Sequence, residues 1–104
     1  MATKLSDQQL QPLLAQLPAW RFAAERGGII VREYRFHDFA QAMGFMAQVA
    51  VIAEKRNHHP EWFNVYNKVA VTLTTHDVDG LSMNDIELAR YMDQVAEALA
   101  TQQR

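Results

Sequence analysis

The chain contains no cysteine, little glycine or proline, and no long apolar run, and each absence narrows its class. Without cysteine, disulfides, thiolate nucleophiles and zinc–thiolate sites are all excluded. No apolar stretch approaches the ~20 residues that a membrane-spanning helix needs. Residues 1–6 lack the continuous apolar segment of a secretory signal. We therefore expect a cytoplasmic protein with no membrane partner.

An excess of basic residues is also missing. The formal net charge is −2, and acidic side chains crowd the C-terminal third of the chain. Proteins that bind nucleic acid usually carry a basic surface, so we expect no direct contact with DNA or RNA. At 104 residues the chain is long enough for one modest core and too short for separate cofactor and substrate domains. A single domain over residues 1–104 is expected.

The first part of the chain is expected to form a short helix and a hairpin. Ser6 followed by Gln9 is typical of a capping box, and the leucines after it repeat at helical spacing until Pro18. Two segments rich in aromatic and β-branched residues, 19–24 and 28–36, flank a glycine pair. This pattern predicts two antiparallel strands joined by a tight turn.

A long helix is expected next, with Asp38 as its cap. Its end should lie close to His58, because Pro60 disfavours helical backbone in the residue before it. Apolar residues at helical spacing predict one buried stripe. The stripe consists of Phe39, Ala42, Met43, Met46, Val49, Ala50 and Ala53.

A second hairpin is predicted over about residues 61–66 and 69–74. It should turn through residues 67–68, because the asparagine at position 67 tolerates the positive φ of a tight turn. Apolar residues alternate with smaller or polar ones in the return strand. The alternation predicts that one face of this strand is buried.

Ser82 followed by Asp85 offers another capping box, after which an amphipathic helix closes the chain. Its apolar positions are Leu88, Ala89, Met92, Val95, Ala96 and Leu99. The order of elements is α-β-β-α-β-β-α. It predicts an α+β fold: a four-stranded antiparallel sheet with three helices packed on one face.

Three of the four histidines, His58, His59 and His76, fall within 19 residues and are accompanied by carboxylates. Imidazole, with an ordinary pKa of about 6.5, donates or accepts a proton near neutral pH, so the cluster indicates proton chemistry. Glu54 lies four residues before His58, where a continuous helix would bring the carboxylate to the imidazole. The negative end of the helix dipole also favours a protonated His58.

Other interpretations stay open at this point. The adjacent histidines could merely cap the preceding helix, and Asp85 could act only as a helix cap worth about 0.5–1 kcal/mol. Three imidazoles can also hold a catalytic zinc ion. Of the neighbours Trp62 and Phe63, at least one is expected in the core, while the other can flank a planar heterocycle. His37 is expected at the surface, apart from the cluster.

Residues 54–69, EKRNHHPEWFNVYNKV, together with 72–76, 80–82 and Asp85, closely resemble the pterin-4a-carbinolamine dehydratases. The expected order of helices and strands is also similar to that family's α+β fold. The resemblance implies dehydration of 4a-hydroxytetrahydropterin to quinonoid dihydropterin, which restores the pterin after an aromatic amino acid hydroxylase has used it. It implies no metal and no cofactor, because the pterin is the substrate.

By the same resemblance, His58, His59 and His76 match the family's active-site histidines, and Glu54 and Asp85 match its supporting acidic positions. We expect His58, aided by Glu54, to be the general acid, His76 the general base, and His59 a residue that binds and polarises the pterin. The family commonly forms dimers or tetramers, so a homodimer or homotetramer is expected. Some members are dimerisation partners of a homeodomain transcription factor. The alternative function is therefore a pterin-binding or regulatory partner protein without turnover.

Overall fold

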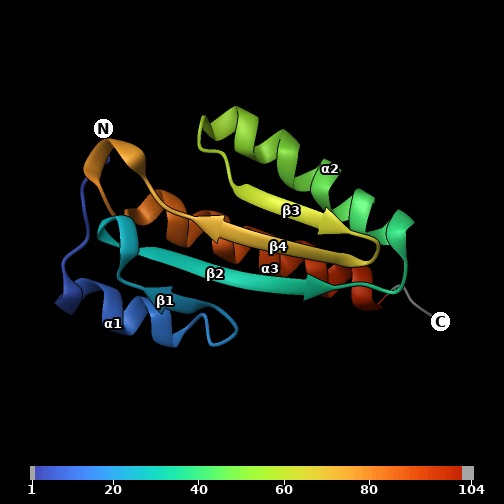
Figure 1. Ribbon diagram of the computed structural model, residues 1–104, viewed down its shortest axis with the longest axis horizontal. Coiled ribbons are helices and arrows are strands. Elements are labelled where there is room, and N and C mark those ends of the chain that lie inside the picture. Colours follow the sequence, from blue (N-terminus) through green and yellow to red (C-terminus); the bar gives the residue numbers. More distant parts are fainter. Residues whose placement is uncertain (1, 102–104) are drawn as a thin grey trace.

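The computed structural model describes residues 2–101, which form three α-helices and a four-stranded antiparallel sheet (Figure 1). The predicted α+β class and the order α-β-β-α-β-β-α are confirmed. No helix within these residues is both long and apolar enough to cross a bilayer. The elements are α1 (Asp7–Ala15), β1 (Arg21–Ala23), β2 (Ile29–Arg35), α2 (Phe39–Arg56), β3 (Glu61–Val65), β4 (Lys68–Leu73) and α3 (Met83–Thr101), with 3₁₀ turns η1 (Glu25–Gly27) and η2 (His76–Val78).

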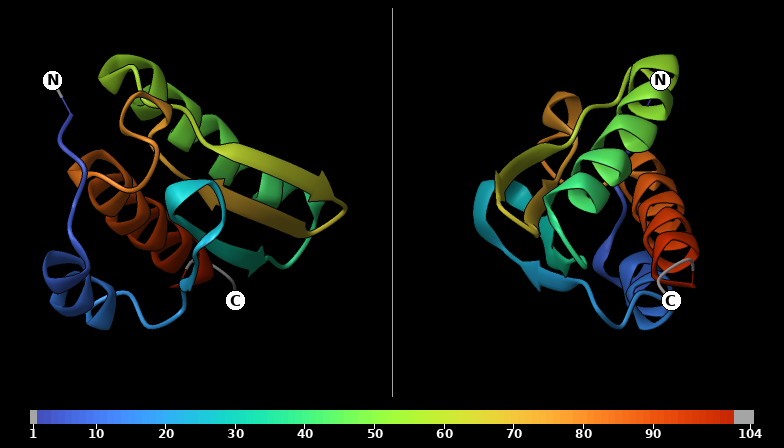
Figure 2. Two further views of the ribbon diagram at one scale, coloured as in Figure 1. Left: turned by 60° about the vertical axis from the view of Figure 1, so that its left-hand side comes forward. Right: turned by 90° about the vertical axis from the view of Figure 1, so that its right-hand side faces the viewer.

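The strand order in the sheet is β1-β2-β4-β3, so β2 pairs with β4, the second strand of the later hairpin. The three helices lie on one side of the sheet, as the turned views show (Figure 2). On that side β4 buries Val69, Val71 and Leu73, which confirms the alternation predicted for this strand. The loops at the left-hand end of the sheet in Figure 1, after α2, β1 and β4, converge around the start of β3.

The core fills the space between the sheet and the helices, and α2 contributes a narrower line than predicted. Phe45, which the expected stripe omitted, is fully buried, whereas Phe39 and Met43 are 49% and 44% exposed. The prediction is therefore wrong at these two positions and at Ala50, which is also exposed. The helix meets the sheet and α3 along one i, i+3, i+4 line only. The buried residues of that line are Ala42, Phe45, Val49 and Ala53.

The helix caps agree with the sequence. At α1, the Ser6 hydroxyl accepts from the amide of Gln9 at 3.2 Å, and the Gln9 side chain accepts from the amide of Ser6 at 2.8 Å. At α2, the Asp38 carboxylate accepts from the amide of Gln41 at 2.8 Å. These bonds satisfy amides that have no partner within the helix, and so they fix where each helix begins.

The second hairpin turns one residue earlier than predicted. Val65 pairs with Lys68, so the loop consists of Tyr66 and Asn67. Tyr66, rather than Asn67, takes the positive φ, at 52°. The Asn67 side chain instead donates to the carbonyl oxygen of Phe36 at 2.8 Å. This bond to the end of β2 explains why the asparagine does not occupy the left-handed position that its propensity favours.

Candidate active site

The end of α2 delivers the histidine pair to the edge of the sheet. Helical backbone stops at Arg56, and Asn57 follows in the left-handed conformation with φ of 51°. The amide of His58 donates to the carbonyl of Ala53 at 3.0 Å, as in helices closed by a left-handed residue. Pro60 then leads into β3. The predicted helix end near His58 is confirmed.

All three predicted site histidines line one cavity of about 330 Å³. The His58 side chain is 11% exposed, whereas those of His59 and His76 are 55% and 77% exposed. A ligand in this cavity would therefore meet one sheltered imidazole and two that face solvent. The lining residues are Asn57, His58, His59, Pro60, Glu61, Thr74, Thr75, His76 and Asp77.

His58 is paired with Asp85, which is fully buried. Its Nε2 lies 2.7 Å from Oδ1 of Asp85. The second carboxylate oxygen, Oδ2, accepts from the Thr75 hydroxyl at 2.6 Å and from the amide of Ser82 at 3.0 Å. Asp85 is thus the predicted helix cap and, at the same time, the partner of a site histidine. These bonds hold the carboxylate in one place, and the carboxylate in turn orients the imidazole.

Glu54 does not pair with His58, contrary to the expectation from its spacing. Its carboxylate instead lies 2.9 Å from Nε2 of His59. The cause is the left-handed Asn57, which ends the helix before position 58 and so takes His58 off the face that Glu54 occupies. The Glu54 side chain is 83% exposed. A pair this open to solvent orients a ring more than it stabilises a fold.

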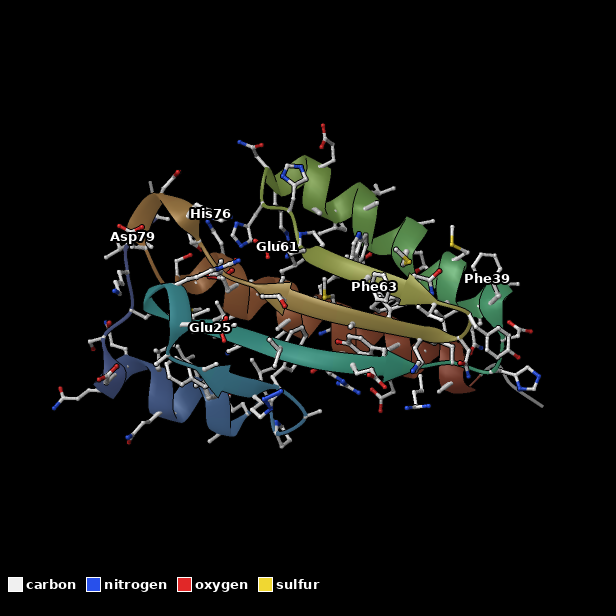
Figure 3. The ribbon with its side chains drawn as sticks, viewed as in Figure 1. Glu25, Phe39, Glu61, Phe63, His76 and Asp79 are labelled. Carbon is white, nitrogen blue, oxygen red and sulfur yellow. The ribbon has the colours of Figure 1, made fainter. Side chains whose placement is uncertain are left out.

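Glu61, which was not among the predicted site residues, is the carboxylate beside His76. Its Oε2 lies 3.4 Å from Nε2 of His76, and both side chains stand at the same end of the sheet (Figure 3). Arg26, in the turn between β1 and β2, donates to both oxygens of Glu61, at 3.0 and 2.9 Å. The hydrogen bonds from Arg26 lower the pKa of Glu61 below its ordinary value. Because Glu61 directly follows Pro60 of the His-His-Pro segment, its position could have identified it as a site residue. Arg26 is 35 residues away from Glu61, and no local pattern pointed to it.

Each histidine of the cavity therefore presents Nε2 to a carboxylate of its own. An ionised carboxylate only accepts hydrogen bonds, so in a neutral His58 or His59 that donates to its carboxylate Nε2 carries the proton and Nδ1 is the acceptor. The carboxylate also stabilises the ring once it is protonated. The arrangement can donate and accept protons around one ligand. The three pairs are His58 with Asp85, His59 with Glu54, and His76 with Glu61.

The two aromatic candidates do not belong to the cavity lining. Trp62 is paired with Val71, faces the helices and packs against the core. Phe63 is 68% exposed and lies farther along β3 from His76 (Figure 3). Contact of either ring with a ligand stays a prediction. His37 is exposed, as expected.

Metal-binding side chains are not grouped for an ion anywhere in the part of the chain that the structure describes. Residues 2–101 contain no set of three or more histidines and carboxylates placed to hold one. The histidines of the cavity are instead distributed among separate carboxylate partners.

The sequence matches a known family over most of its length. The family model described as pterin 4 alpha carbinolamine dehydratase matches residues 3–95. A protein of Novosphingobium aromaticivorans is 59% identical over 90 residues, which cover 86% of this chain and 93% of the relative. A protein of Burkholderia orbicola is 52% identical over 92% of this chain and 93% of the relative. Both are named as pterin-4-alpha-carbinolamine dehydratases.

Solved structures share the fold. The crystal structure of a transcriptional coactivator/pterin dehydratase from Brucella melitensis matches with a TM-score of 0.85 and 45% identity, over 90% of this chain and 99% of that chain. A pterin dehydratase-like protein, described as a RuBisCO assembly factor in the alpha-carboxysome, matches with a TM-score of 0.66 over 75% of this chain and 89% of that chain. At 22% identity, this second match shows a common fold alone.

Proposed function

This chain belongs to the pterin 4 alpha carbinolamine dehydratase family, and we propose that it dehydrates 4a-hydroxytetrahydropterin to quinonoid dihydropterin by histidine acid–base catalysis. An enzyme of this kind is a hydro-lyase. The observation that carries the proposal is the convergence of three imidazoles, each beside a carboxylate, on one cavity. The physiological role that we propose is to restore the pterin for an aromatic amino acid hydroxylase.

The reaction needs one proton donor and one proton acceptor. The C4a–O bond breaks, and the hydroxyl leaves as water after its oxygen has taken up a proton. N5 loses its proton as the C4a–N5 double bond forms. Imidazoles near neutral pH can serve both steps. No electron is transferred to or from the pterin, and we propose that neither a redox cofactor nor a metal takes part.

His58 is the proposed general acid. Its ring is sheltered from solvent, and its Nε2 lies 2.7 Å from Oδ1 of the buried Asp85, which orients the imidazole. It also lies just beyond the C-terminal end of α2, where the helix dipole favours positive charge. Asp85 thus takes the supporting role that the spacing had suggested for Glu54.

His76 is the proposed general base, and His59 the residue that binds and polarises the pterin. The carboxylate of Glu61 lies 3.4 Å from Nε2 of His76, so Nδ1 is the ring nitrogen available to take the proton of N5. His59 is 55% exposed and is oriented by Glu54, which suits a group that meets the substrate at the mouth of the cavity.

An assay with freshly generated 4a-hydroxytetrahydropterin tests the proposal. The absorbance change of dehydration is followed with and without the protein, and with and without a chelator such as EDTA. We expect acceleration that the chelator does not affect. Loss of turnover with the chelator and its return with zinc would favour a metal mechanism. Pterin binding without acceleration would make the protein a binding module, a role closer to the coactivator part of the Brucella melitensis relative's name.

Self-association is proposed as well. Large apolar side chains are exposed on α2 and on the hairpin of β3 and β4, where a small protein gains by burying them against a second copy. Size-exclusion chromatography with light scattering should show a dimer or tetramer, and a monomer at micromolar concentration would contradict the proposal. The exposed residues are Phe39, Met43, Val51, Phe63, Val65 and Tyr66.

A further inference from the structure

We propose that Arg26 and Glu61 are positioning residues for His76, and that through them the turn between β1 and β2 holds the ring that accepts the proton. The inference rests on the proposed function, in which His76 is the general base. It assigns a role in the reaction to a turn whose sequence indicated only the closing of a hairpin. Glu61 touches the imidazole directly, whereas Arg26 acts through Glu61.

The first support is the shape of the contact between the two side chains. Nη1 and Nη2 of Arg26 donate to Oε1 and Oε2 of Glu61, respectively. Two parallel bonds of this kind fix the plane of a carboxylate as well as its position. Oε2, the oxygen bound by Nη2, is also the one that lies 3.4 Å from Nε2 of His76. The carboxylate therefore cannot rotate away from the imidazole without breaking its bonds to the guanidinium.

The second support is that the backbone of the turn touches the loop that carries His76. Gly27 has a φ of +80°, and a Cβ there would lie 1.9 Å from the carbonyl oxygen of Asp79. On the other side, a Cβ at Gly80 would lie 2.8 Å from the carbonyl oxygen of Gly27. The two segments thus pack backbone against backbone, next to Arg26. This contact holds the backbone that carries the Arg26 side chain beside the loop that begins with the 3₁₀ turn at His76.

The third support is the contrast between the histidines. His58 is held by burial and by Asp85, whereas the His76 side chain is 77% exposed and has no core packing to choose its rotamer. An exposed imidazole must lose rotamer freedom before it can act on a bound pterin. Glu61 supplies that restraint before the substrate arrives. The other charged or titratable groups around His76 are Asp77 and Asp79 of its own loop, and His58 and His59 across the cavity.

Steady-state kinetics of single variants give the first test. Arg26→Met and Glu61→Gln should each lower kcat about 10-fold and leave KM within about twofold, because the base is misplaced while the pterin still binds. Arg26→Lys should recover only part of the loss, since an ammonium group keeps the charge but not the two-pronged geometry. Full activity of Arg26→Met would overturn the inference.

A matched control comes from β2, where Arg35 and Glu33 form a comparably exposed ion pair, at 3.1 Å, away from the histidine cavity. Arg35→Met should leave both kcat and KM unchanged. If this variant lost as much activity as Arg26→Met, the effect of Arg26 would be a general effect of surface charge, and the positioning role would be rejected.

Two combinations test whether the residues act in series. In a His76→Ala background, adding Arg26→Met should lower kcat no further. The Arg26→Met/Glu61→Gln double variant should have a kcat no lower than that of either single variant. A further loss of about 10-fold in the His76→Ala background would show that Arg26 acts elsewhere, because independent effects multiply.

A measurement without substrate separates this inference from the proposed function. In the free protein, ¹³C relaxation of the His76 ring should report greater mobility in Arg26→Met than in the wild type, with the His58 ring unchanged. Equal mobility of the His76 ring in both proteins would overturn the positioning role. Absence of dehydration by the wild type would instead defeat the proposed function, and the ring measurement would still decide whether Arg26 and Glu61 restrain His76.

Discussion

Asp85 lies 27 positions after His58 in the sequence, and the two side chains meet at 2.7 Å, between Oδ1 and Nε2. The other oxygen of the same carboxylate accepts from the amide of Ser82 and so caps α3. One buried group thus determines where a helix begins and how a site imidazole is oriented. Correct formation of α3 and assembly of the cavity depend on the same residue.

Asp85→Asn should impair both stability and turnover. The amide cannot accept all the bonds that the carboxylate accepts from His58, Thr75 and Ser82, and it removes the charge beside the imidazole. We expect the free energy of unfolding to fall by about 3 kcal/mol, the usual cost of disrupting a buried charged network. Turnover should fall about 100-fold, since proton transfer by His58 is impaired. Urea denaturation and the dehydration assay measure the two effects.

The capping box of α1 provides the control for this variant. Ser6→Ala removes a helix cap that has no part in the cavity. It should lower the free energy of unfolding by about 1 kcal/mol and leave turnover unchanged. If Asp85→Asn matched Ser6→Ala in both measurements, Asp85 would be a helix cap and nothing more.

Glu54→Gln should change substrate affinity more than the rate of the chemical step. Glu54 orients His59, the proposed pterin-binding residue, through an exposed contact at 2.9 Å. We expect KM to rise about threefold with kcat nearly unchanged, as happens when binding alone is weakened. Stability should stay within about 0.5 kcal/mol of the wild type. A fall in kcat like that of a His58→Ala variant would instead link Glu54 to the general acid.

The ion pair of Arg26 and Glu61 should make stability depend on pH. Arg26 lowers the pKa of Glu61 in the folded protein, so the unfolded chain binds a proton at a higher pH, near the ordinary value of about 4.3. The stabilisation is therefore fully present above that value and is lost as the pH falls through the lower folded-state pKa. The difference in unfolding free energy between wild type and Arg26→Met should be largest near neutral pH and shrink toward about pH 3. Urea denaturation across this range checks it, and a difference that grows on acidification would contradict it.

Tyr34 should remain protonated in mild alkali. Asp93 accepts hydrogen bonds from Tyr34, Arg32 and Trp20, at 2.5, 2.6 and 3.0 Å. Burial and then the bond to Asp93 raise the pKa of Tyr34 well above its ordinary value of about 10. The resulting stabilisation is present below that value and is lost as the pH rises through the folded-state pKa.

The substitution Tyr34→Phe tests this network. It should lower the free energy of unfolding at neutral pH by about 1–2 kcal/mol, the worth of a hydrogen bond to a charged group. The tyrosinate absorbance of the folded protein near pH 11 should equal that of the wild type, because Tyr34 contributes nothing to it. A smaller absorbance in the variant would show that Tyr34 ionises. Turnover should be unchanged, since the network lies outside the histidine cavity.

Two glycines should respond to alanine in opposite ways. Gly27→Ala places a Cβ against the carbonyl oxygen of Asp79 at a strained φ, and it should destabilise the fold by roughly 2–3 kcal/mol. At Gly44, within α2, an added Cβ meets no atom within 4 Å. Gly44→Ala should therefore stabilise by about 1 kcal/mol through helix propensity. Thermal denaturation measures both changes in stability. If both variants were stabilised, or both destabilised, the prediction would be contradicted.

Local patterns were sufficient to predict the elements of this fold and insufficient to predict some of its turns. The caps at Ser6 and Asp38 depend on residues three positions away, and such short-range signals survive folding. The turn at Tyr66 and Asn67 depends on a bond from Asn67 to Phe36, a distant residue. Tertiary contact overrode the propensity of asparagine for positive φ there.

The site was predictable as a set of histidines and not as a set of pairs. His58 and His59 stood out because they are adjacent and precede a proline. Glu54, the expected partner of His58, contacts His59 instead, because the left-handed Asn57 ends the helix before them. Asparagine often closes a helix in this way, so that signal was available. Arg26 could not be found from spacing, because its contact with Glu61 exists only after the β1–β2 turn has packed on the loop after β4.

The pairing of β2 with β4 means that the centre of the sheet joins two halves of the chain that are synthesised at different times. Each hairpin and α2 can begin to form from its own segment. The pairing of β2 with β4, which includes Ile30 and Leu73, requires a large loop to close first. Arg26 precedes the two strands that close this loop, His58 lies within the loop, and His76 and Asp85 follow it. A nascent or nicked chain could therefore contain every histidine and still lack a working active site until β2 and β4 have paired.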